Sequence, residues 1–61
     1  MVNQDLVNRL VSLMDQGLIK VADIKNVDYS TAVVSFYKAE VVAGKITADQ
    51  YLIITGQAYV A

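Results

Sequence analysis

The chain contains no cysteine and no histidine. Without cysteine it can form no disulfide, and the usual zinc sites, which combine cysteine and histidine ligands, are excluded as well. A histidine base and a cysteine nucleophile are also missing, which excludes the common forms of nucleophilic catalysis. A domain of 61 residues buries only about 60% of the surface that its unfolded chain exposes. We therefore expect its stability to be reinforced by association with another chain.

Groups for other kinds of catalysis are scattered along the chain. The six acidic residues stand on different segments, and no Asp-x-Asp loop of the kind that binds divalent cations occurs. The three glycines are isolated from one another, so they do not form a phosphate-binding loop. We therefore expect no enzymatic activity, no cofactor and no bound metal.

Charge is low and evenly spread, with five basic and six acidic residues. There is no basic cluster to follow a phosphate backbone, and residues 47–55, where a recognition helix would lie, contain no lysine or arginine. Nucleic acid is thus not an expected partner. The longest uncharged run, residues 50–61, is shorter than the roughly 20 apolar residues that cross a bilayer. The N-terminus lacks the long apolar core of a signal peptide.

The apolar content is high for so small a domain. Hydrophobic residues make up 56% of the chain, against roughly 45–50% in an ordinary soluble domain. A small helical domain has too little interior to cover them all. We expect an exposed apolar face that contacts a second copy of the chain or a larger protein assembly, and the alternative is a monomer that is simply rich in apolar residues.

The first expected helix covers residues 4–16. Asn3 is a suitable N-cap, Asp5 places a negative charge at the positive end of the helix dipole, and Gly17 ends the helix. Apolar residues recur at helical spacing along it. They are Leu6, Val7, Leu10, Val11, Leu13 and Met14.

The second expected segment, residues 20–26, is short and poorly capped. Its buried side would contain Val21, Ile24 and Val27, and a turn is expected at Asn26 and Asp28.

The third expected helix covers residues 31–43, with Ser30 or Thr31 as its N-cap. Its many β-branched residues raise the alternative of a strand. Alternation with a period of two leaves neither side of such a strand apolar, whereas a helix gathers the large apolar residues on one broad side. These residues are Val33, Val34, Phe36, Tyr37 and Val41.

A short segment after the third helix carries the strongest local signals. Gly44 should end that helix, and Ile46 should pack between two helices. Thr47 and Gln50 form a capping box that starts a last helix, and Tyr51 supplies part of its buried side.

The last helix should also bury Ile54 and should end at Gly56. Tyr59 or Val60 can then fold back over that end.

A fainter copy of this pattern lies 27 residues upstream. Gly17 corresponds to Gly44, Ile19 to Ile46, and Ile24 to Tyr51. The fold class expected for residues 1–61 is therefore all-α, a single small bundle of two helical hairpins with three to four short helices. Whether the two halves arose by duplication is left open.

The run Gly44-Lys45-Ile46-Thr47-Ala48-Asp49-Gln50-Tyr51, followed by Ile54-Thr55-Gly56, resembles the C-terminal signature of the small phage and prophage proteins of the XkdX family. The glycine-leucine turn at Gly17 and the final aromatic Tyr59 also have counterparts in that family. Its members are encoded among tail genes, and no catalytic residues are assigned to them. The resemblance implies a non-enzymatic structural or assembly protein of the phage tail or baseplate, located in the virion or in the host cytoplasm during assembly.

A similar helix-glycine-isoleucine-threonine turn occurs in short bacterial oligomerisation modules of the SHOCT type, which gives an alternative in which the domain simply associates. In either case the contacts would be between proteins, and aromatic residues are frequent at the centres of such interfaces. Tyr29, Phe36 and Tyr59 are the candidates here, whereas Tyr37 is expected in the core with its hydroxyl at the edge.

Overall fold

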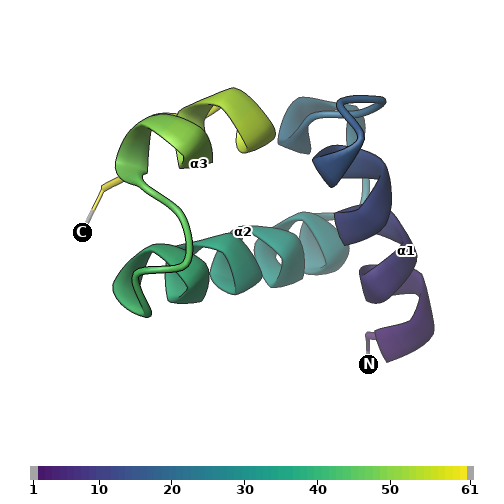
Figure 1. Cartoon of the computed structure of the whole chain (residues 1–61). Coiled ribbons are helices and arrows are strands. Elements are labelled where there is room, and N and C mark those ends of the chain that lie inside the picture. Colours follow the sequence, from purple (N-terminus) through teal and green to yellow (C-terminus); the bar gives the residue numbers. More distant parts are fainter. Residues whose placement is uncertain (1, 61) are drawn as a thin grey trace.

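The computed structural model describes residues 2–60, and within that range helices are the only regular secondary structure, with no strand (Figure 1). The longest helix, α2, contacts every other element, and α1 also contacts α3. The expected all-α bundle is thus confirmed. The elements in chain order are α1 (Gln4–Asp15), the 3-10 turn η1 (Val21–Asp23), α2 (Val27–Val42) and α3 (Ala48–Thr55).

Helix α1 begins and ends at the signals that the sequence contains. The side-chain oxygen of Asn3 accepts hydrogen bonds from the amides of Asp5 at 2.9 Å and Leu6 at 3.3 Å. At the other end, Gly17 takes a left-handed conformation with φ of 77°. The helix ends at Asp15, one residue earlier than predicted.

The predicted helix over residues 20–26 is wrong. Only η1 forms there, with the carboxylate of Asp23 accepting a hydrogen bond from the amide of Lys20 at 2.8 Å. The next helix begins so soon afterwards that no room remains for a second turn. Val21 is buried as expected, but Val27 is 73% exposed because it opens α2.

Helix α2 begins four residues before the predicted start. Its N-cap is Asn26, whose side-chain oxygen accepts hydrogen bonds from the amides of Asp28 at 2.9 Å and Tyr29 at 3.3 Å. Neither Ser30 nor Thr31 is the cap, and the turn predicted at Asn26 and Asp28 is in fact this helix start. The choice of helix over strand is confirmed.

Helix α3 runs back along α2 after a tight connection (Figure 1). Its capping box is confirmed, because Thr47 accepts from the amide of Gln50 at 3.1 Å and Gln50 accepts from the amide of Thr47 at 2.8 Å. Gly56 ends the helix with φ of 77°. Of the two predicted hairpins, the second is present as α2 and α3. The first is reduced to α1 followed by η1.

The core lies where α1, α2 and α3 meet. Its fully buried apolar residues come from all four elements and include two tyrosines. One polar residue, Thr55, is buried among them, and its hydroxyl lies 2.7 Å from the carbonyl oxygen of Tyr51. Sequence patterning did not indicate that threonine as a core position. The buried apolar residues are Val7, Met14, Val21, Val33, Tyr37 and Tyr51.

Besides Val27, two more apolar residues expected on buried sides are exposed. Leu6, in the first turn of α1, and Phe36, in the middle of α2, each lie at the rim of the core, and Phe36 is 41% exposed. None of the helices in the described range has the length and apolar character that crossing a bilayer requires.

Candidate functional site

The predicted turn residues lie in two equivalent chain reversals. After α1, the amide of Leu18 donates to the carbonyl oxygen of Leu13, and after α2 the amide of Lys45 donates to that of Glu40, at 3.0 and 2.9 Å. Gly17 and Gly44 both have positive φ, and open space lies where a side chain would begin. These glycines serve the backbone conformation of a Schellman motif.

The two isoleucines that follow these glycines have the expected role. Ile19 and Ile46 are both half-buried and pack against the core. Tyr51 is fully buried. Thr47 and Gln50 cap α3. Most residues of the motif at 44–56 therefore have a structural role.

The third glycine, Gly56, lies against the loop that follows α1. A side chain added at Gly56 would meet the aliphatic part of Lys20 at 3.5 Å. The Lys20 ammonium donates to the carbonyl oxygens of Ile53 and Ile54, the latter at 3.4 Å. A cation at this position stabilises the negative end of the α3 dipole. This contact joins the two halves of the chain, and no sequence signal had indicated it.

Tyr37 is in the core, as expected, and its hydroxyl reaches α1 at the edge. It lies 2.6 Å from a carboxylate oxygen of Asp15 and 3.0 Å from the carbonyl oxygen of Val11. Burial raises the pKa of Tyr37, and the hydrogen bond to Asp15 and the negative charges of Asp15 and Glu40 raise it further. The hydroxyl of Tyr37 thus joins α2 to α1.

The three candidate interface aromatics lie against different partners. The hydroxyl of Tyr29 accepts a hydrogen bond from the amide of Asn3 at 3.0 Å, which ties the start of α2 to the start of α1. Tyr59 packs edge-to-face on Tyr51, with ring centroids 5.3 Å apart. Both tyrosines are half-buried, so their first role is structural.

Phe36 keeps the largest exposed fraction of the three. Its ring packs edge-to-face on Tyr37 with centroids 5.2 Å apart, while its outer side faces solvent. It is the aromatic that the structure leaves available for a partner.

Large apolar side chains are exposed on every helix. On α3 they follow one another directly: Leu52 is 47% exposed and Ile53 is 69% exposed. We call these two residues the outer face of α3. The exposed large apolar residues of the described range are Leu6, Leu18, Val27, Phe36, Val42, Leu52, Ile53 and Val60.

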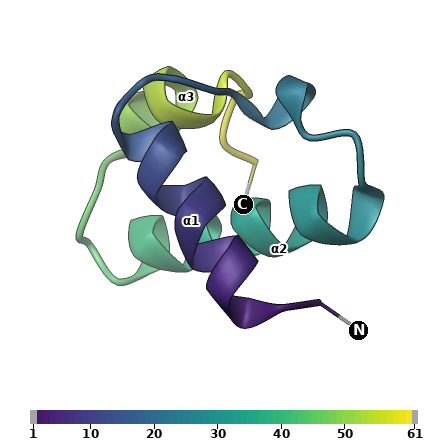
Figure 2. The ribbon, with the colours of Figure 1, turned by 90° about the vertical axis from the view of Figure 1, so that its right-hand side faces the viewer.

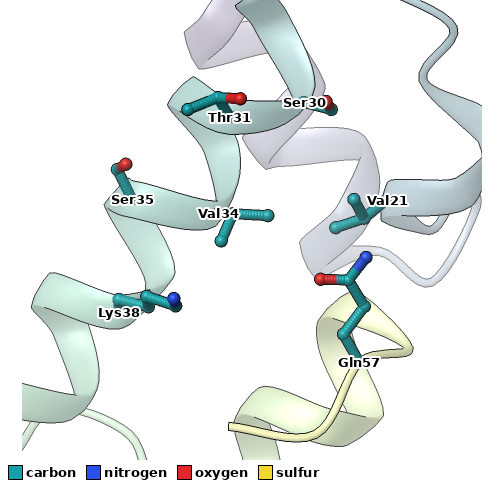
Figure 3. Close-up of a pocket in the computed structure, with 7 residues that line it drawn as sticks. All are labelled: Val21, Ser30, Thr31, Val34, Ser35, Lys38 and Gln57. Carbon is teal, nitrogen blue, oxygen red and sulfur yellow. The ribbon is translucent and has the colours of Figure 1, made fainter. Parts of the chain in front are cut away.

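A surface hollow of about 250 Å³ lies between η1, α2 and the segment after α3 (Figure 3). Two valines form its apolar part, and hydroxyl, carboxamide and ammonium groups surround them. Within residues 2–60 the structure contains no cluster of three metal-ligating side chains. The lining residues of the hollow are Val21, Ser30, Thr31, Val34, Ser35, Lys38 and Gln57.

Besides the exposed ring of Phe36, the surface offers two features that could contact a partner, the outer face of α3 and the hollow beside α2. No known protein family, curated protein or solved structure matches the chain. The function therefore has to be inferred from these two features and from the motif of residues 44–56.

Proposed function

We propose that this chain is a non-enzymatic protein-interaction domain that associates with a second copy of itself through the outer face of α3. We further propose that it serves as a structural or assembly protein of a phage tail or baseplate. The first proposal is supported by the surface of α3, and the second by the motif of residues 44–56.

The composition of α3 supports an interface on its outer side. Four large apolar residues follow one another at positions 51–54, whereas a helix at the surface of a monomer usually alternates between apolar and polar faces. The core takes Tyr51 fully and Ile54 in part. Leu52 and Ile53 are left in solvent, and adjacent exposed apolar residues of this kind are typical of association surfaces.

The charge distribution favours a second copy of the chain as the partner of the outer face of α3. Asp49, in the first turn, is the one charged residue of α3, so two copies whose α3 helices pair antiparallel would keep these two like charges at opposite ends of the contact. Two-fold pairing of identical surfaces is the commonest form of assembly. A standard interface covers about 800 Å² per partner, roughly a fifth of the 4162 Å² surface of this chain, so the contact would extend beyond Leu52 and Ile53 to the surface around them.

The phage context is supported by the resemblance of residues 44–56 to the XkdX signature. In the structure Tyr59, the final aromatic of that signature, packs on the motif's Tyr51. On this proposal the protein is present in the virion or in the host cytoplasm during assembly. The SHOCT-type alternative rests on the shared glycine-isoleucine-threonine turn and predicts the same self-association in a different gene context.

Two measurements test these proposals separately. Sedimentation equilibrium over a concentration series should show a reversible oligomer, and a single monomer at every concentration would overturn the self-association. Mass spectrometry of purified virions should detect the chain if it is a virion component. If instead tail intermediates from infected cells contain it and virions do not, it is an assembly factor. Absence from both would overturn the phage proposal.

A further inference from the structure

The hollow beside α2 combines an apolar floor with a cation. Figure 3 shows the side chains of Val21, Val34 and Gln57 directed toward one another across the hollow, with Lys38 one helical turn beyond Val34 on α2. Val21 is buried and Val34 is half-buried, so the floor is fixed by the core beneath it. None of the lining residues is acidic.

Within residues 2–60, Lys38 takes part in no ion pair. The residues three and four positions away from it on α2 are valines and a serine, so no neighbouring turn supplies a carboxylate. The one ion pair found within residues 2–60 joins Lys45 to Glu40 at 3.8 Å. Lys20, by contrast, is bound to the carbonyl oxygens at the end of α3. Among the described residues, the ammonium of Lys38 thus has no carboxylate to pair with, and a partner protein could supply one.

We propose that this hollow binds a carboxylate next to an apolar side chain, presented by a partner protein. The apolar side chain would lie on Val21 and Val34, the carboxylate would pair with Lys38, and the carboxamide of Gln57 would hydrogen-bond to the main chain of the partner. A volume of about 250 Å³ is below the ~300–1,000 Å³ of ordinary small-molecule pockets. It suits a single residue of a protein rather than a cofactor.

This site would give the domain a second contact, because the hollow and the outer face of α3 contain different residues. The inference rests on the proposed role as a protein-interaction domain, and it assigns an acidic partner segment to a surface that self-association does not use.

The probe is N-acetyl-L-leucine, which carries one apolar side chain and one carboxylate, titrated into ¹⁵N-labelled full-length protein. Saturable shifts are expected for the amides around the hollow, such as those of Val34, Lys38 and Gln57. N-acetyl-L-leucinamide, which lacks the charge, should bind more weakly by up to about fivefold, as the loss of one exposed ion pair implies. Lys38→Met should lower the affinity for the acid to that of the amide. Lys25→Met, which removes an exposed lysine outside the hollow, should leave it unchanged.

Three results would overturn the proposal. One is the absence of shifts at the hollow with the acid. Another is equal affinity for the acid in the unsubstituted chain, in Lys38→Met and in Lys38→Glu, which reverses the charge. The third is equally large shifts at the hollow with inorganic phosphate, since phosphate has no apolar group and its binding would show that the valines contribute nothing. Sedimentation of the same samples reports on α3 independently, so the two proposals can fail separately.

Discussion

The hydroxyl of Tyr37 lies 2.6 Å from a carboxylate oxygen of Asp15, and this contact ties the middle of α2 to the last turn of α1. Figure 2 shows α1 lying across α2 where the two helices meet. The carbonyl oxygen of Val11 is also near, at 3.0 Å. The hydroxyl has one proton, and the shorter contact with a charged acceptor is the stronger of the two. Tyr37 and Asp15 thus form a hydrogen bond between two helices at the edge of an apolar interface.

Tyr37→Phe should therefore destabilise the fold while leaving its core filled. A hydrogen bond to a charged group contributes about 1.5–3 kcal/mol, and the exposure of Asp15 places the expected loss in unfolding free energy at the low end of that range. Urea unfolding followed by circular dichroism measures it. Tyr29→Phe is the matched control, because its hydroxyl accepts from the exposed amide of Asn3 and should matter less. An equal loss in both variants would contradict the special role of Asp15.

The burial and hydrogen bonding of Tyr37 should also make the stability of the fold decrease at alkaline pH. The pKa of Tyr37 is raised above its ordinary value of 10.0 in the folded state, and burial also raises that of Tyr51. Above about pH 10 the unfolded chain loses these protons while the folded chain keeps them, so the free energy of unfolding falls as pH increases. Below that pH both states are protonated and these groups contribute no slope.

Unfolding free energies measured between pH 8 and 11 would test this, with the window set by the ordinary tyrosine pKa near 10. Tyr37→Phe should show a shallower decline above pH 10 than the unsubstituted chain. Identical slopes in the two proteins would mean that Tyr37 titrates in the folded state as it does in the unfolded one.

The capping box of α3 is a second local test. Thr47→Ala removes the acceptor for the amide of Gln50 and should lower the free energy of unfolding by about 1 kcal/mol. Ser35→Ala is a suitable control, because Ser35 is exposed in the interior of α2, where alanine favours the helix slightly. If Thr47→Ala behaved like that control, the box would contribute nothing to stability.

The helix ends could be predicted from the sequence because their signals are local. Gly17, Gly44 and Gly56 all take positive φ at the ends of helices, and the box at Thr47 is present as expected. The start of α2 also has a local signal, but the prediction of a turn there is wrong. Asn26 and Asp28 have the same spacing as Asn3 and Asp5 at the start of α1, and both asparagines cap a helix.

This parallel changes how the two halves correspond. The capping asparagines are 23 residues apart and the terminating glycines 27, and α2 is longer than α1 by four residues, about one helical turn. Half of the capping box at Thr47 and Gln50 recurs upstream: Asp23 accepts from the amide of Lys20 at 2.8 Å as Gln50 accepts from the amide of Thr47, but the ammonium of Lys20 cannot accept a hydrogen bond in return. The contact between Lys20 and Asp23 opens only a 3-10 turn because Asn26 starts a new helix three residues later.

Contacts between distant segments could not be predicted in this way. Helical periodicity does not specify how the helices cross. That crossing determines both the hydrogen bonds of Lys20 at the end of α3 and the exposure of Phe36. The hollow beside α2 was missed for the same reason. Its lining comes from η1, from α2 and from Gln57 after α3, and no stretch of sequence contains them together.

The outer face of α3 leads to the prediction that bears most directly on function. Ile53→Lys places a charge where Ile53 is 69% exposed, so the monomer should fold as before, while two such faces would repel each other across a dimer. The oligomer seen in sedimentation should therefore dissociate at concentrations where the unsubstituted chain remains assembled. Val42→Lys is the matched control, because Val42 is 79% exposed at the end of α2 and should leave the oligomer intact. If Val42→Lys alone dissociated the assembly, the interface would lie on α2, and α3 would be a helix whose apolar outer side has no partner.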